Sequence, residues 1–124
     1  MTHEQAHEFA TKWAAAWNRR DLEAVLAHFA DDAEFVSPKA QQFVGRSALK
    51  GKAELRRYWE TALEQISDIA FTLDSVFLGP GEREVAVLYT SRLNGRASRA
   101  MEILRFNEKG HIVRGEAMYG VSVE

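Results

Sequence analysis

The hydrophobic pattern of this chain changes period once, between residues 66 and 69. Before the change, apolar residues recur mainly every three or four positions, as on one face of a helix. After it they alternate with polar residues, as in strands. This order predicts an α+β fold in which helices cover one face of a curved antiparallel sheet. The length of 124 residues fits a single domain over residues 1–124.

Three helices are predicted in the N-terminal half. Thr2 and Gln5 have the spacing of a capping box at the start of the first helix, and Asp21 can cap a short second one. The third helix, residues 55–66, has the most regular apolar spacing in the chain. These N-terminal helices are therefore expected to pack on the sheet through one apolar face each.

The remaining segments read as strands and turns. A short strand is expected at 33–37, ended by Pro38, and a polar loop then runs to Lys50. In the second half, Asn94-Gly95 is a typical type I′ hairpin turn, because both residues must adopt positive φ. Turn signals of this kind separate four predicted strands, residues 69–78, 84–93, 96–106 and 111–123.

A curved sheet with helices on one side forms a cone. Such a sheet cannot fill its own hollow, so we expect a pocket between the helices and the concave face. A concave, mostly apolar pocket of this kind is the usual place for a ligand or an active site.

Composition narrows the function classes. The net charge of −2 provides no basic patch for a phosphate backbone, so nucleic acid is not an expected partner. The absence of cysteine excludes disulfides and thiolate chemistry. No run of 18 apolar residues is present, and the first residues, MTHEQAHEFATKW, lack the apolar region of a signal peptide. We therefore expect no membrane partner and a cytoplasmic location.

Two short motifs suggest a metal or phosphate site but lack the required context. HEQAH, residues 3–7, fits the zinc pattern H-E-x-x-H, yet it lies in the first turns of a terminal helix without an evident third ligand. GRSALKGKA, residues 45–53, resembles a P-loop but has five residues between the glycines and no Ser or Thr after the lysine. We read Asp31-Asp32 as solvated turn residues. No metal and no cofactor are therefore predicted.

Glu102 is the polar residue that stands out in the strands. Alternation places it on one face of its strand with Ala100, Leu104 and Phe106, all of which are apolar. A carboxylate on an apolar face must be paired, protonated or functional, because an unpaired buried charge is costly. A structural ion pair with an arginine and a functional acid are both open interpretations. Tyr89 lies in the preceding strand and Tyr119 in the last one, from which either could reach this carboxyl. Both could equally be packing residues with a satisfied hydroxyl.

Two aromatic clusters allow two interpretations. Trp13 with Trp17, and Tyr58 with Trp59, occupy the apolar faces of predicted helices. Aromatic side chains dominate small cores, so packing alone explains them. If the cone is hollow, the same side chains line a ligand site.

Three phrases carry a resemblance to a known family. WNRRDLEAVLAHFADDAEFVSP, GKAELRRYWETAL and EILRFNEKGHIVRGEAMYG occur in an order and spacing similar to the nuclear transport factor 2-like superfamily, and within it to the SnoaL-like group. The resemblance covers nearly the whole chain. It implies a cone-shaped α+β fold with an apolar pocket, commonly as a homodimer paired through the outer face of the sheet. The superfamily includes isomerases, polyketide cyclases, epoxide hydrolases, dehydratases and non-catalytic subunits, so fold does not fix activity.

Matched through these phrases, the chain also resembles ketosteroid isomerase, in part. The position of that family's catalytic base falls on Ser37, which cannot shuttle a proton as a carboxylate does. The oxyanion-hole tyrosine falls on Trp13, and the protonated acid of the oxyanion hole falls on Glu102. Of the three matched positions, only Glu102 carries a side chain suited to the role that the resemblance implies. Steroid isomerisation is therefore not expected.

Two function classes follow. The first is an enzyme that transforms a small, mostly apolar molecule by acid–base chemistry without a metal, as an isomerase, cyclase or hydrolase. The second is a non-catalytic ligand-binding or dimerisation module with the same pocket. Catalysis needs two or more polar groups placed against each other, whereas binding needs one. The candidate catalytic residues are Glu102 and Tyr89, and the candidate ligand contacts are Trp13, Trp17, Ser37, Trp59 and Tyr119.

Overall fold

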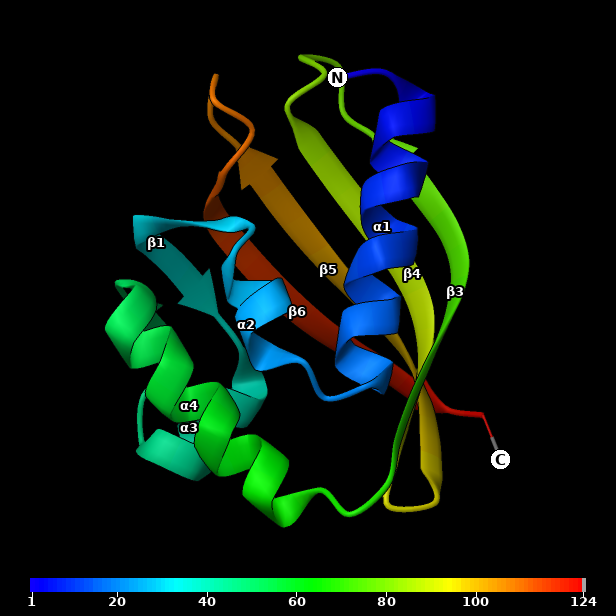
Figure 1. Ribbon diagram of the computed structural model, residues 1–124. Coiled ribbons are helices and arrows are strands. Elements are labelled where there is room, and N and C mark those ends of the chain that lie inside the picture. Colours follow the sequence, from blue (N-terminus) through cyan, green and yellow to red (C-terminus); the bar gives the residue numbers. More distant parts are fainter. Residues whose placement is uncertain (124) are drawn as a thin grey trace.

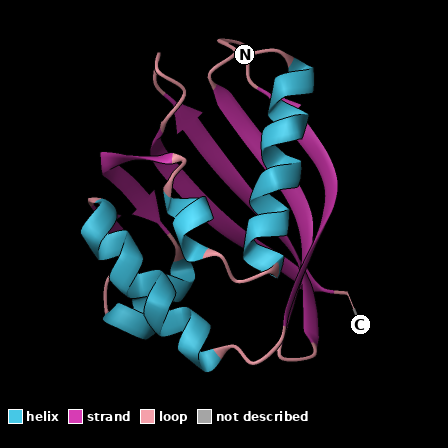
Figure 2. Ribbon diagram, viewed as in Figure 1, coloured by secondary structure: helices cyan, strands magenta, loops and turns pink. Residues whose placement is uncertain are grey.

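In the computed structural model, which describes residues 1–123, helices cover the concave side of a curved six-stranded sheet (Figure 1). Figure 2 shows the same separation of helices from strands. The sheet order is β2-β1-β6-β5-β4-β3. The elements are α1 (His3–Asn18), α2 (Leu22–Leu26), β1 (Phe29–Val36), α3 (Pro38–Val44), β2 (Ala48–Lys50), α4 (Lys52–Gln65), β3 (Ile69–Leu78), β4 (Glu84–Leu93), β5 (Arg96–Phe106) and β6 (Ile112–Ser122). The predicted α+β class is confirmed.

Helix α1 begins at the predicted capping box and ends on the edge of the sheet. The Thr2 hydroxyl accepts from the backbone N–H of Gln5 (3.1 Å), and the Gln5 side chain accepts from the N–H of Thr2 (2.9 Å). At the other end, the Asn18 side chain accepts from the N–H of Phe71 (2.6 Å) and donates to its carbonyl (3.0 Å). Because β3 is an edge strand, this amide replaces a neighbouring strand and holds α1 across it.

The last four strands follow the sequence prediction closely. β3, β4 and β5 have the predicted bounds, and β6 differs by one residue at each end. The hairpin turn is confirmed, since Asn94 and Gly95 have φ values of 52° and 82°. The Asn94 side chain also accepts from the N–H of Ser67 (2.8 Å) and donates to the carbonyl of Gln65 (3.2 Å). The β4–β5 turn is thereby tied to the end of α4.

The region predicted as a polar loop is structured. Ser37 caps α3 by accepting from the N–H of Lys39 (3.2 Å), Pro38 occupies the first turn, and Gly45 ends the helix with φ 77°. These are ordinary start and stop signals, but a seven-residue helix is too short to show a clear apolar period. β2 follows and pairs antiparallel with β1, whereas β1 pairs parallel with β6. The chain thus has a fourth helix, and one strand pair is parallel.

The core lies between the helices and the concave face of the sheet. Its largest fully buried side chains are Trp13, Leu26, Phe29, Leu49, Leu55, Tyr89, Leu104 and Ile112. None of the helices within residues 1–123 combines the length and hydrophobicity that a membrane crossing requires.

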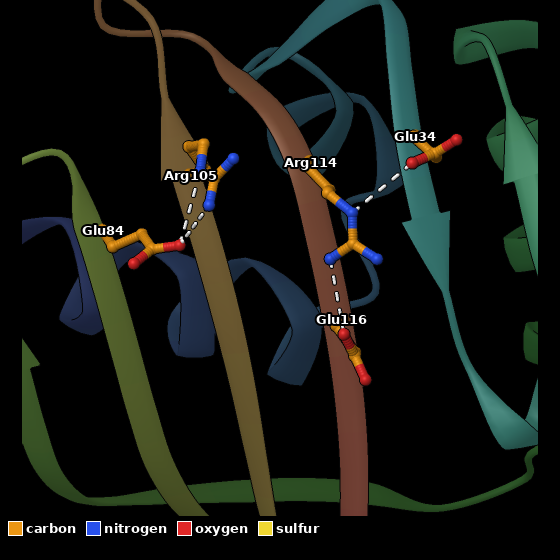
Figure 3. Close-up of polar contacts among 5 residues, drawn as sticks. All are labelled: Glu34, Glu84, Arg105, Arg114 and Glu116. Carbon is orange, nitrogen blue, oxygen red and sulfur yellow. Dashed lines mark hydrogen bonds and ion pairs between the residues drawn. The ribbon is translucent and has the colours of Figure 1, made fainter. Parts of the chain in front are cut away.

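The outer face of the sheet has an apolar centre between charged pairs. Strand register places Leu88, Met101 and Met118 side by side, with Ile103 next to them and the half-exposed Phe77 beyond. On one flank, shown in Figure 3, Arg105 pairs with Glu84 (2.9 Å), and Arg114 lies between Glu34 (3.4 Å) and Glu116 (3.3 Å). On the other flank Arg99 pairs with Asp74 (2.6 Å). An uncovered apolar surface with a charged rim is typical of a protein–protein interface.

The expected homodimer stays a prediction, and this face is where we expect it to form. Met118→Glu places one carboxylate on each copy, and a two-fold interface brings both onto the same apolar surface. Because an unpaired buried charge is costly, we expect wild type to sediment as a dimer at micromolar concentration and Met118→Glu as a monomer.

The matched control is Thr11→Glu, which adds the same charge at an exposed position of α1. This control should remain dimeric. Monomeric wild type at micromolar concentration, or an equal effect of both substitutions, would remove the claim.

Candidate functional site

A cavity of about 300 Å³ lies between helices α3 and α4 and the concave face of β3 to β6. Its walls are mainly aromatic and aliphatic, and include Trp17, Phe35, Phe43, Trp59, Leu63 and Phe71. Most small-molecule sites have such a composition, and this volume is at the lower end of their range. A hollow thus lies where the sequence predicts a pocket, and its use by a ligand stays a prediction.

Glu102 lies in the wall of this cavity. The predicted alternation of β5 is confirmed, because Ala100, Glu102, Leu104 and Phe106 are all buried. Only 7% of the Glu102 surface is exposed. The carboxyl group thus occupies an apolar face, as the sequence indicates.

No cation among residues 1–123 neutralises this carboxyl group. The hydroxyl of Tyr89, on the neighbouring strand β4, donates to Oε2 of Glu102 (3.3 Å), and no ion pair involves Glu102 in the described chain. The arginines of β5 and β6 that form ion pairs, Arg99, Arg105 and Arg114, pair with other carboxylates on the outer face. The interpretation of Glu102 as a structural ion-pair residue therefore does not hold within residues 1–123.

The second carboxyl oxygen is the one that can reach a ligand. Within residues 1–123, Oε1 of Glu102 has no hydrogen-bond partner. It is also not fully enclosed, since Trp17 Nε1 is the only fully buried side-chain polar atom without a partner among these residues. Because Glu102 lines the cavity, this oxygen is open to it. A molecule in the cavity can complete the hydrogen bonding of the carboxyl group.

Burial sets the protonation of Glu102. Desolvation raises its pKa to about 8, and the hydrogen bond from Tyr89 opposes this only in part. The group is therefore mainly a neutral acid at pH 7. Burial first, and the adjacent Glu102 second, hold the pKa of Tyr89 well above its usual range. At neutral pH both groups carry a proton that can be donated in a hydrogen bond.

Ser37 belongs to a second polar pair beside the first. It is fully buried, and its hydroxyl lies 3.3 Å from that of Tyr58. Tyr58 and Tyr119 line the cavity, and burial is the main cause that raises the pKa of each. Negative charge on Glu102 would raise both pKa values further. Glu102, Tyr89, Tyr58 and Tyr119 thus converge on one region of the cavity, and Ser37 orients Tyr58.

The predicted tryptophan contacts divide between wall and core. Trp17 and Trp59 line the cavity and meet edge to face, with ring centroids 5.4 Å apart. Trp13 is buried and does not line the cavity; it stacks on Phe71 at 5.6 Å and lies edge-on to Tyr89 at 5.1 Å. It therefore supports two wall residues, and a direct contact of Trp13 with a ligand stays a prediction.

Lys39 is a cavity residue that the sequence analysis missed, and Tyr58 lines the cavity as one of the predicted aromatic clusters allows. Lys39 comes from α3, and its ammonium group lies 4.3 Å from the centre of the Tyr119 ring. Burial lowers the pKa of this amine. The sequence signal that could have placed it is the run Ser37-Pro38 to Gly45, which marks a helix rather than a loop. Tyr58 was identifiable from its helix face but not as the partner of Ser37.

The HEQAH segment forms no metal site in the described part of the chain. His3 and His7 lie on α1, where Nε2 of His3 contacts the carbonyl oxygen of Val76 (3.2 Å). No group of three or more metal-binding side chains occurs within residues 1–123.

Comparison with known proteins identifies the family. Residues 10–115 match the SnoaL-like domain. A SnoaL-like protein of unknown function from Burkholderia thailandensis is 34% identical, covering 97% of this chain and 98% of its own, with a TM-score of 0.87. No protein of curated function matches the sequence.

More distant solved structures share the fold. A putative ketosteroid isomerase from Kribbella flavida is 20% identical, with a TM-score of 0.75 over 98% of this chain and 82% of its own. TerC, co-crystallised with polyporic acid, is 16% identical, with a TM-score of 0.77 over 93% of this chain and 91% of its own. Other neighbours are described as having NTF2-like and cystatin-like folds. The chain belongs to the SnoaL-like family.

Proposed function

We propose that this protein binds a small, mostly apolar molecule in the cavity and acts on it by acid–base chemistry centred on Glu102. The observation that carries the proposal is the buried carboxyl group without a cation partner in the described chain, set in the wall of a cavity of about 300 Å³. The aromatic walls favour a ligand with an apolar body, and the free oxygen of Glu102 favours a ligand that also carries a hydrogen-bonding atom.

The protonation of the site favours a ligand oxygen as that atom. With a pKa of about 8, Glu102 donates a hydrogen bond at neutral pH, and a carbonyl or hydroxyl oxygen can accept it. If negative charge develops on that oxygen, the neutral acid stabilises it by donating a stronger hydrogen bond or the proton itself. Tyr89 then stabilises the carboxylate that remains, because its hydroxyl already donates to Oε2.

Several polar groups converge on the cavity, which favours turnover over binding alone. Glu102, Tyr89, Tyr58 and Tyr119 lie near one another, and Lys39 lines the same cavity. Non-catalytic ligand binding is the second candidate function. It is favoured by Ser37, because a hydroxyl bonded to Tyr58 is a weak base, and Glu102 is then the only carboxyl group among the described residues that line the cavity.

Two proteins that share the fold are described with a small-molecule ligand or with a putative activity on one, which supports the proposed class of ligand. One neighbour is described as a putative ketosteroid isomerase, and TerC was crystallised with polyporic acid. These structures are less than 25% identical to this chain, so they do not specify its substrate. The expected cytoplasmic location likewise stays a prediction.

Glu102→Gln should remove a pH dependence of folding stability. The pKa of Glu102 rises from about 4.3 in the unfolded chain to about 8 in the folded protein. The folded state therefore holds an extra proton between these values, and its stability falls as pH rises from about 5 to about 8. Relative to wild type, the variant should gain of the order of 1 kcal/mol per pH unit across this range, as measured by urea unfolding.

Tyr89→Phe is the matched control for this titration. It removes the hydrogen bond that lowers the pKa of Glu102, so the pH range of the effect should move upward. Identical pH profiles for wild type and Glu102→Gln would show that Glu102 is ionised throughout, and the proposal would lose its basis.

The same group should control ligand preference. We expect 2-acetonaphthone to bind more tightly than 2-ethylnaphthalene at pH 6, by about fivefold, because only the ketone accepts a hydrogen bond from Glu102. The preference should fall as pH rises past 8 in wild type, should become independent of pH in Glu102→Gln, and should vanish in Glu102→Leu. Fluorescence of Trp17 and Trp59, which line the cavity, reports binding. Equal affinity for both probes at pH 6 would contradict the role of Glu102.

Steroid isomerisation should be absent. That reaction needs a base to move a proton between two carbons, and Ser37 stands where the catalytic carboxylate of ketosteroid isomerase is expected. Ser37 is also engaged as the cap of α3 and by Tyr58. Incubation with a β,γ-unsaturated 3-ketosteroid should give no conjugated enone above the uncatalysed rate. Measurable turnover would show that another residue supplies the base.

A further inference from the structure

A polar groove adjoins the apolar cavity near the turn between β4 and β5. The groove and the cavity share Lys39, Ser91 and Leu93, so the two hollows are contiguous. Beyond these shared residues, the groove is lined by hydroxyl groups and a guanidinium group from Ser98, Ser122 and Arg96. Its chemistry therefore differs from that of the aromatic cavity.

The alternation of β5 explains this change along one face. Arg96, Ser98, Ala100 and Glu102 occupy successive positions on the same side of the strand. On β4, Ser91 pairs directly with Ser98, so two hydroxyl-bearing residues lie between the buried acid and the terminal arginine. The concave face thus runs from a neutral acid, through hydroxyls, to a cation.

The two cations of the groove lack carboxylate partners in the described chain. Most arginines on the surface pair with an acid, as Arg99 does with Asp74 and Arg105 with Glu84. Neither Lys39 nor Arg96 forms an ion pair within residues 1–123, and no carboxylate among those residues lines the groove. Lys39 is half-buried against the Tyr119 ring. An anion in the groove could therefore form a charge-assisted hydrogen bond with its ammonium group in a partly desolvated position.

We propose that Lys39 and Arg96 bind an anionic group of the ligand, a carboxylate or a group of similar charge, while the apolar part of the same molecule fills the cavity. This inference rests on the proposed function and narrows its substrate class to amphipathic anions. Serine hydroxyls of the groove can donate further hydrogen bonds to the anion. The molecule then spans from the oxygen held by Glu102 to the charge held at the mouth.

Phenylalkanoic acids and their primary amides test the proposal, because each pair has the same apolar body and a head group of similar shape that is charged in the acid and neutral in the amide. We expect wild type at pH 7 to bind 4-phenylbutanoate or 6-phenylhexanoate about tenfold more tightly than the matching amide. Added salt should weaken binding of the acid only. The double variant Lys39→Met, Arg96→Gln should lose this preference and keep its affinity for the amide. Tryptophan fluorescence and calorimetry measure both affinities.

The control Lys109→Met, Arg57→Gln removes the same charge at two exposed positions outside the groove. It should keep the preference for the acid. If the acid binds no better than the amide, or if both double variants reduce the preference equally, the anion site is wrong while cavity binding stands. If neither acid nor amide binds to wild type, the proposed cavity function fails for this ligand class, and the anion site fails with it.

Discussion

The site depends on a carboxyl group that is buried without a cation in the described chain. A charged carboxylate would be costly at this position, so the folded protein holds Glu102 mainly in its neutral form. The surroundings fit this state: one tyrosine hydroxyl contacts the group, aromatic rings line the cavity, and ion-paired arginines of the sheet lie on its outer face. The curvature of the sheet keeps the space in front of the acid open, since the helices cover the concave side without filling it.

Much of this arrangement can be predicted from the sequence, for local reasons. Alternation identifies Glu102, because a strand has only two faces. The two-residue turn at Asn94-Gly95 also fixes the register of its hairpin, with Leu93 opposite Arg96, so that Val87 lies opposite Glu102 and Tyr89 lies diagonal to it. Tyr89 and Glu102 are thirteen residues apart in the sequence, and their contact is thus nearly determined by the turn between them.

The rest depends on contacts between distant segments. The parallel pairing of β1 with β6 joins residues about eighty apart and has no local signal. The same holds for the hydrogen bond of Ser37 to Tyr58 and for the position of Lys39 against Tyr119. The helix that presents Lys39 has capping signals at Ser37 and Gly45 but too few turns for a period, so a loop was the simpler and incorrect prediction. The contribution of this segment to the cavity wall is visible only in the folded chain.

The central claim is that Glu102 is a neutral acid at pH 7. Its direct test is a titration of the side-chain carboxyl carbon by NMR in protein labelled with ¹³C-glutamate, with Glu102→Gln used to assign the resonance. The account predicts a single midpoint for Glu102 near pH 8. A midpoint close to the ordinary glutamate value of about 4.3 would contradict it, because the carboxyl group would then be charged in the cavity at neutral pH.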